Sequence, residues 1–180
     1  MIESLLHGAL VVLVLVAAWI DLRSRRIPNL LTVLGLLLAL ALRAAMGWEA
    51  LFSGVMAMGI VVLFALPIFA LGGLGGGDVK LLGMVGGFLG LDLLWGAVFM
   101  TLVVGGALAL ISVLRRGKAG ETLANLYIIV RGLRQKESYT GWKGAEGSAP
   151  LTIRSAGVVT RPFAVAIAAG AVYAVYPSFF

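Results

Sequence analysis

Residues 10–21 read LVVLVLVAAWID, an apolar run that ends at Asp21, and the polar stretch DLRSRRIPN continues from this aspartate to Asn29. A second aspartate, Asp78, follows a glycine run in LGGLGGGDVK, residues 71–80, and another apolar stretch comes after it. A carboxylate beside hydrocarbon is energetically expensive, so an ionisable residue there is a candidate functional residue. These two stretches therefore indicate both the class of protein and the residues that are candidates for its chemistry.

The composition is that of a membrane protein. Of the 180 residues, 61% are hydrophobic and 12% are charged, whereas a soluble domain has about 25% charged residues. Apolar stretches predict transmembrane helices at residues 5–20, 30–46, 50–71, 81–91, 93–114 and 156–176. We therefore predict an all-α, polytopic membrane protein with six transmembrane helices, forming a single membrane-embedded domain over residues 1–180. No positive charge precedes the first apolar stretch, so we expect a retained helix and not a signal peptide.

The distribution of lysine and arginine predicts the orientation. If the N-terminus lies outside, six alternating spans place every lysine and arginine except Arg43 on the cytoplasmic side, as the positive-inside rule requires. Asp21 and Asp78 then lie at the same, cytoplasmic, face. In the cytoplasmic loop 115–155, apolar and basic residues recur at helical spacing, which predicts an interfacial helix on anionic lipid headgroups.

The fourth apolar stretch is too short to span a membrane. Residues 81–91 would make roughly 16 Å of helix, against about 30 Å of hydrocarbon. We therefore expect the glycine-rich segment 72–80 to enter the membrane, with non-helical or loosely helical backbone just before Asp78. Irregular backbone at that depth needs protein or water around it, so we expect a polar cleft at this aspartate.

The residue inventory limits the hydrolytic chemistry. The sequence has no cysteine, one histidine (His7) and no H-E-x-x-H motif, which argues against a thiol nucleophile and a zinc site. We expect no metal and no other cofactor. Two carboxyl groups about 3 Å apart share one proton, so one can activate water while the other protonates the scissile carbonyl oxygen. Asp21 and Asp78 are thus candidate catalytic residues, and the assignment of acid and base belongs to the pair.

Residues beside the aspartates are candidates for substrate binding or for shaping the site. Gly75 and Gly77 have no side chain, so an extended substrate backbone could approach the neighbouring carboxylate closely. Pro28 is favoured at the first position of a helix, so Pro28 and Asn29 are expected to begin the second span. Lys80 is most simply a topogenic charge, and steering of a substrate is the alternative. Small-xxx-small spacings predict helix packing for another set of glycines, Gly83, Gly86, Gly87 and Gly90.

Three motifs resemble those of the type IV prepilin peptidases, which are membrane-embedded aspartyl proteases of the G-x-G-D type. They are Asp21 followed by IPN at 27–29, GGGDVK at 75–80, and RPFAVAIAAGA at 161–171, which is similar to the family's last helix. The resemblance implies that Asp21 and Asp78 are the catalytic aspartates. It also implies prepilin or pseudopilin substrates and an inner-membrane location with the active site facing the cytoplasm. Membrane lipids and other pilus-assembly proteins are the further partners expected, and nucleic acid is not.

Bifunctional relatives in this family have an additional cytoplasmic region with metal-binding cysteines and also methylate the new N-terminus. This cysteine-free sequence is similar instead to the short, peptidase-only branch that serves tight-adherence (Flp-type) pili. The resemblance therefore implies cleavage of a short basic leader ahead of an apolar helix, without methyl transfer.

Two other functions are open from the residues alone. A proton-coupled transporter could use Asp21 and Asp78 as a proton relay, but no acid or base occurs in the middle of any predicted span. A non-catalytic pilus-assembly subunit is the other alternative, although it would not need two carboxylates on one face.

Overall fold

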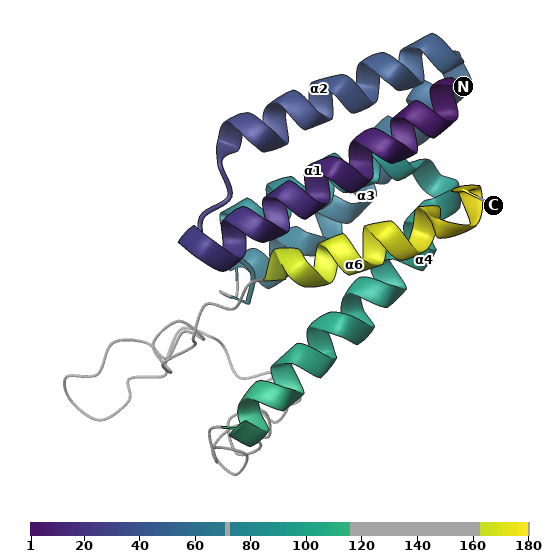
Figure 1. The fold of residues 1–180 in the computed structure, drawn as a ribbon. Coiled ribbons are helices and arrows are strands. Elements are labelled where there is room, and N and C mark those ends of the chain that lie inside the picture. Colours follow the sequence, from purple (N-terminus) through teal and green to yellow (C-terminus); the bar gives the residue numbers. More distant parts are fainter. Residues whose placement is uncertain (71–72, 116–162, 180) are drawn as a thin grey trace, which may run out of the picture.

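The computed structural model describes residues 1–70, 73–115 and 163–179, and these residues form helices and no strand (Figure 1). The elements are α1 (Ile2–Ser24), α2 (Asn29–Met46), α3 (Trp48–Ala70), α4 (Gly76–Arg115), α6 (Phe163–Val175) and a 3-10 helix, η1 (Tyr176–Phe179). Helices α1 to α4 are long and apolar enough to cross a membrane, and α6 is a shorter apolar helix. The prediction of an all-α protein with membrane-spanning helices is confirmed for these residues, while the number of six spans stays a prediction.

The first three helices begin and end close to the predicted residues. Helix α1 continues past Asp21 to Ser24 and ends at Arg25, which has left-handed backbone angles (φ 52°, ψ 29°) and donates its N–H to the carbonyl oxygen of Asp21. Helix α2 begins at Asn29, and Pro28 precedes it with an extended backbone. Pro28 was predicted at the first position of the helix, and it stands instead immediately before the helix, as its N-cap residue.

Helix α4 consists of two segments, 76–89 and 91–115, because the backbone is not helical at Gly90 (φ 63°, ψ −174°). Only glycine adopts these angles readily. Residues 81–91 and 93–114 were expected to form separate helices, and the break between them lies at Gly90. The first segment is about 21 Å long, since helix already begins at Gly76. The expectation of non-helical backbone just before Asp78 is therefore wrong for Gly76 and Gly77.

The first segment of α4 is the centre of the fold. Residues 81–90 are buried on all sides except at the half-buried Leu82, which explains why this stretch is apolar around its whole circumference. Its largest buried side chains, Leu81, Met84, Phe88 and Leu89, pack in one cluster with residues of α1, α2 and α6. Two of the predicted packing glycines make close helix contacts here. A Cβ built on Gly86 would lie 3.1 Å from backbone atoms of α3, and one on Gly83 would lie 3.1 Å from a side chain of that helix.

A buried arginine binds the backbone of α4 next to the break at Gly90. Arg43 of α2 is only 7% exposed, and its Nε and Nη2 donate hydrogen bonds of 3.3 and 2.9 Å to the carbonyl oxygen of Phe88. Its Nη1 donates to the carbonyl oxygen of Ala50, at 2.9 Å. The guanidinium therefore binds a carbonyl at the C-terminal end of segment 76–89, where the helix itself offers no donor. Gly90 lies against this guanidinium and has no room for a side chain.

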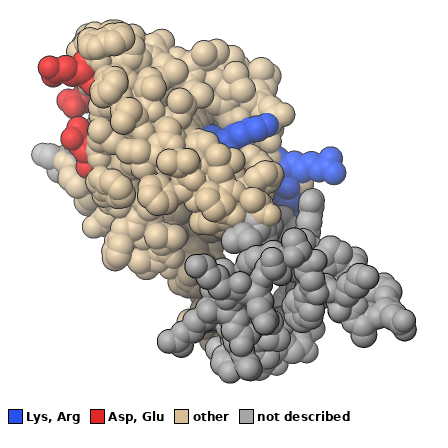
Figure 2. Space-filling model, turned by 180° about the vertical axis from the view of Figure 1, so that it is seen from behind, with Lys and Arg blue, Asp and Glu red and all other residues tan. Residues whose placement is uncertain are grey.

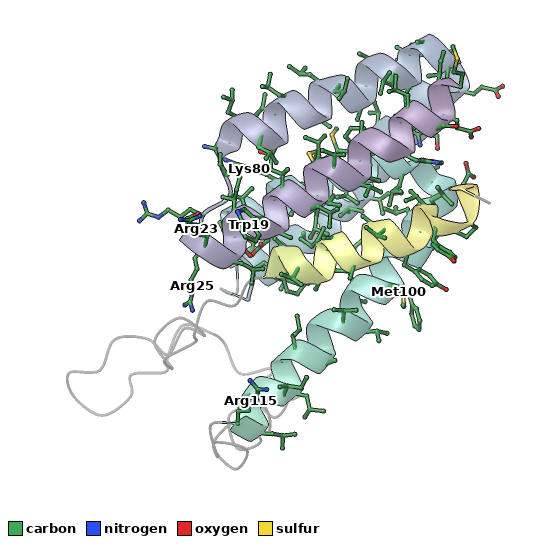
Figure 3. All side chains as sticks on the ribbon, viewed as in Figure 1. Trp19, Arg23, Arg25, Lys80, Met100 and Arg115 are labelled. Atoms are coloured by element: carbon green, nitrogen blue, oxygen red, sulfur yellow. The ribbon has the colours of Figure 1, made fainter. Side chains whose placement is uncertain are left out.

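On the face shown in Figure 2, the visible acidic side chains lie on one side of the helix bundle and the visible basic side chains on the opposite side. Figure 3 shows Arg23, Arg25 and Lys80 at the end where α1 finishes and α2 begins. The acidic residues Glu3 and Glu49 lie in the first turns of α1 and α3, at the other end. This separation agrees with the expected sidedness, and the orientation itself stays a prediction. The expected interfacial helix and the cytoplasmic loop 115–155 lie outside the described residues, apart from Arg115.

Candidate active site

The glycine run determines how Asp78 is held at the start of α4. The backbone N–H of Gly75 donates to Oδ2 of Asp78 at 3.1 Å, and the N–H groups of Asp78 and Val79 donate to the carbonyl oxygen of Gly75 at 3.1 and 3.2 Å. The bond from Gly75 to the Asp78 side chain is one half of a capping box, in which an acidic side chain in the first turn reaches back to a free N–H; the other half is absent because glycine has no side chain. A Cβ on Gly75 would lie 3.1 Å from Oδ2 of Asp78, so glycine also leaves room for the carboxylate.

Asp21 is held by a residue from the far end of the sequence. It lies in the last turns of α1 and is only 7% exposed. Its Oδ2 accepts a hydrogen bond of 3.3 Å from the backbone N–H of Ala164, in the first turn of α6. The sequence predicts an aspartate at the end of an apolar run, and the structure adds that its carboxyl group is enclosed between two helices.

The structure brings the two predicted aspartates to the same end of the bundle. Asp78 lies in the first turn of α4, and Asp21 lies in the last turns of α1, just before the loop that contacts this turn of α4. In each of them Oδ2 accepts a hydrogen bond from a main-chain N–H. Among the described residues, no lysine or arginine forms an ion pair with Asp21 or Asp78, and no three His, Asp or Glu side chains gather as a metal site would require. Two neighbouring carboxyl groups, each with one oxygen held by the backbone, are suited to acid–base chemistry on water.

The loop between α1 and α2 docks on the first turn of α4. A Cβ built on Gly77 would lie 3.3 Å from Cβ of Ile27, so the helix passes close to this loop. One turn further, Nζ of Lys80 donates a hydrogen bond of 2.8 Å to Oδ1 of Asn29. Pro28, which lies between Ile27 and Asn29, is exposed. The predicted site residues thus lie around one junction, because the contacts of Gly77 and Lys80 tie this loop to the helix that carries Asp78.

Sequence reasoning missed two residues of this junction. Ile27 is the residue that limits the space beside Gly77, and the backbone N–H of Ala164 is the hydrogen-bond donor to Asp21. Both belong to motifs that show the family resemblance, IPN at 27–29 and RPFAVAIAAGA at 161–171. An aliphatic side chain and a main-chain amide have no chemical signature in a sequence, so the motifs were the signal available.

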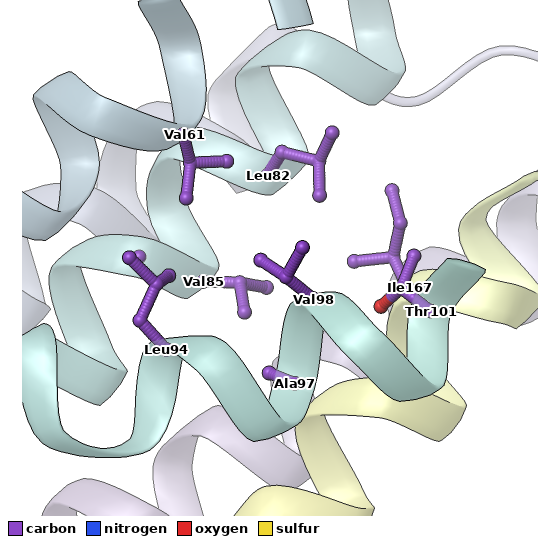
Figure 4. Close-up of a pocket in the computed structure, with 9 residues that line it drawn as sticks. Val61, Leu82, Val85, Leu94, Ala97, Val98, Thr101 and Ile167 are labelled. Carbon is purple, nitrogen blue, oxygen red and sulfur yellow. The ribbon is translucent and has the colours of Figure 1, made fainter. Parts of the chain in front are cut away.

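A cavity shown in Figure 4 lies elsewhere in the bundle. Nonpolar side chains of α3, α4 and α6 line it, with Thr101 as the polar exception, and neither aspartate contributes to its wall. It is therefore not the polar cleft expected around Asp78, and that cleft stays a prediction.

Comparisons with known proteins identify the family. The model of the type IV leader peptidase family matches residues 8–110, more than half of the chain, and this range contains both aspartates and the whole junction between α1, α2 and α4. No curated protein and no solved structure matches the chain significantly. The match agrees with the long apolar helices of the fold, and this chain belongs to the type IV leader peptidase family, whose members are peptidases.

Proposed function

We propose that this peptidase is an aspartyl endopeptidase in which Asp21 and Asp78 are the catalytic residues. Its proposed reaction is removal of the leader from type IV prepilins of the Flp type, at the cytoplasmic face of the inner membrane. The observation that supports it best is that two carboxyl groups from separate helices are each held through one oxygen by a backbone N–H, at the end of the bundle where α1 finishes and α4 begins.

The chemistry follows from the shared environment of the two carboxyl groups. Neighbouring carboxyls do not both ionise readily, so the pair holds one proton between them. The ionised group takes a proton from water, and the water attacks the scissile carbonyl carbon while the protonated group donates to the carbonyl oxygen. Which aspartate holds the proton is a property of the coupled pair. Because the backbone binds Oδ2 in both residues, Oδ1 is the oxygen assigned to water and substrate.

The membrane simplifies recognition of this substrate. A prepilin has a short basic leader followed by an apolar helix that already lies in the bilayer, so the enzyme has to bind only a few residues at the surface. Gly75 and Gly77 let an extended substrate backbone approach Asp78. The bond between Lys80 and Asn29 keeps the starts of α2 and α4 together beside that path.

The test replaces each aspartate by asparagine, which keeps the shape of the side chain and removes its acid–base chemistry. Asp21→Asn and Asp78→Asn are each expected to lower prepilin cleavage in proteoliposomes by about a hundredfold or more. Asp92→Asn is the matched control, because Asp92 is exposed and follows the break at Gly90, at the other end of the bundle. Its cleavage rate should equal that of the wild type.

If Asp21→Asn or Asp78→Asn still removed the leader completely, the assignment as an aspartyl protease would be refuted. A proton relay makes the opposite prediction, since the same variants would then leave cleavage unchanged and alter proton-coupled transport in the same vesicles.

A further inference from the structure

We propose that the main-chain N–H of Ala164 is a positioning group for catalysis, which holds Asp21 so that its other carboxyl oxygen faces the reacting water. This inference rests on the proposed catalytic role of Asp21. The bond from the N–H of Ala164 to Oδ2 of Asp21 is 3.3 Å long and joins residues 143 positions apart. Asp21 is 7% exposed and Ala164 is fully buried, so bulk water has little access to replace this donor.

The donor is available because of its place in the helix. Ala164 lies in the first turn of α6, where backbone N–H groups have no acceptor within the helix. The N-terminal end of a helix also has a partial positive charge, which favours a neighbouring carboxylate. A carboxylate at this point therefore gains a hydrogen bond that the helix would otherwise leave unused.

Close packing fixes the position of the donor. A Cβ built on Gly105 of α4 would lie 2.9 Å from Cε2 of Phe163, the residue before Ala164. Further along α6, Gly170 lies directly against Ala97 and Thr101 of the same α4 segment. At the first place the ring of Phe163 occupies the space that Gly105 leaves open, and at the second the backbone of α6 lies directly against α4, so α6 packs closely on α4 both at its start and further along. The first turn of α6 is thus held where its N–H reaches Asp21.

The two carboxyl groups are then oriented in the same way. The N–H of Gly75 binds Oδ2 of Asp78, and the N–H of Ala164 binds Oδ2 of Asp21. In both cases the donor belongs to the main chain at the start of a helix, α4 or α6. This assigns a positioning role to the start of α6, FAVAIAAGA at 163–171, whose side chains include no acid, base or nucleophile.

A backbone ester tests the proposal because it removes the N–H and keeps the side chain. Cell-free translation into liposomes can place lactic acid at position 164, so that an ester oxygen replaces the donor. We expect kcat for prepilin cleavage to fall roughly tenfold and KM to stay within twofold, since the reacting geometry changes and the substrate contacts do not.

The matched control is the equivalent ester at Val165, the next N–H in the first turn, which does not contact Asp21. It weakens the helix in the same way and should leave kcat nearly unchanged. Equal losses in the two ester variants would show a general effect on α6 and overturn the positioning role. An ester at position 164 with wild-type kcat would overturn it as well. Asp21→Asn tests the proposed function separately. If Asp21 is catalytic, this variant is inactive whatever the ester at position 164 does; if this variant is active, the proposed function itself has failed.

Discussion

Replacing Gly77 by valine is expected to slow prepilin cleavage about a hundredfold while the protein still folds. A Cβ at this position would lie 3.3 Å from Cβ of Ile27 and 3.6 Å from its Cγ1 and Cδ1. One methyl group therefore already fills the available space, and the two further carbons of valine have to displace either Ile27 or the first turn of α4. Ile27 lies two residues before Asn29, which binds Lys80, and the first turn of α4 contains Asp78 itself.

The magnitude follows from that displacement. A shift of roughly 1 Å in catalytic geometry can lower a rate about a hundredfold, whereas overpacking typically costs about 1–3 kcal/mol of stability. Gly77→Ala adds only the first methyl group, and alanine is favoured over glycine in a helix by up to about 1 kcal/mol. We therefore expect the alanine variant to fold well and to cleave within a few-fold of the wild type.

The assay is single-turnover cleavage of a prepilin in proteoliposomes, together with thermal unfolding of the purified protein in detergent. Gly96→Val is the control, because no atom lies within 4 Å of a Cβ at Gly96. Gly87 is less suitable, since a Cβ there would lie 3.1 Å from Cδ1 of Leu36 and valine would disturb the core. If Gly77→Val cleaves within threefold of the wild type, the contact with Ile27 does not position the site and the reasoning is refuted.

Three further predictions concern the junction, the break in α4 and the orientation. Lys80→Met removes the 2.8 Å hydrogen bond to Asn29 and should lower kcat/KM several-fold, because both residues are exposed and such a bond contributes about 1–3 kcal/mol at most. Arg43→Met should lower the free energy of unfolding by about 3 kcal/mol, since two buried carbonyl groups lose their donor, while the rate per folded enzyme stays unchanged. A cysteine at Ser24 should be protected from impermeant thiol reagents in intact cells, and one at Ser178 should react.

Each of these predictions has its own control and contradicting result. The control for Lys80→Met is Arg115→Met, at the exposed end of α4 (Figure 3), which should not affect cleavage. Equal losses in Lys80→Met and Arg115→Met would show that only surface charge matters. If Arg43→Met had the same unfolding temperature as the wild type, the three hydrogen bonds of Arg43 would not stabilise the fold and the prediction would be wrong. Labelling of the cysteine at position 24 from outside would invert the orientation and place the proposed site on the wrong face.

The helix boundaries were predictable where an apolar run ends at a charged residue or a proline. Helices α2 and α3 begin and end within two residues of the predicted positions, because Pro28 precedes α2, Gly47 separates α2 from α3 and few polar residues interrupt them. The break in α4 was predicted at residue 92, two residues after its observed place at Gly90. The contact between Gly90 and Arg43 was not predictable, because two residues so far apart in the sequence leave no local pattern.

The candidate site was predictable to the extent that it depends on side-chain chemistry. Two carboxylates at the ends of apolar runs are unusual enough to be noticed, and the structure places both at one end of the bundle. The interactions that hold them were not predictable, because both donors are backbone N–H groups, of Gly75 and Ala164. Such a donor is present in every residue except proline, so its importance becomes visible only when the helices are assembled.

The separation of Asp21 from its donor also sets an order of events during synthesis. Ribosomes add about 5–20 residues per second, so the 143 positions between Asp21 and Ala164 correspond to roughly 7–30 s of translation. Asp78 is added 57 positions after Asp21, so for the last 86 positions, roughly 4–17 s, both aspartates exist while the amide that holds Asp21 does not. The nascent chain thus carries its two carboxylates through insertion without the geometry proposed for cleavage, and completing α6 is the step that supplies it.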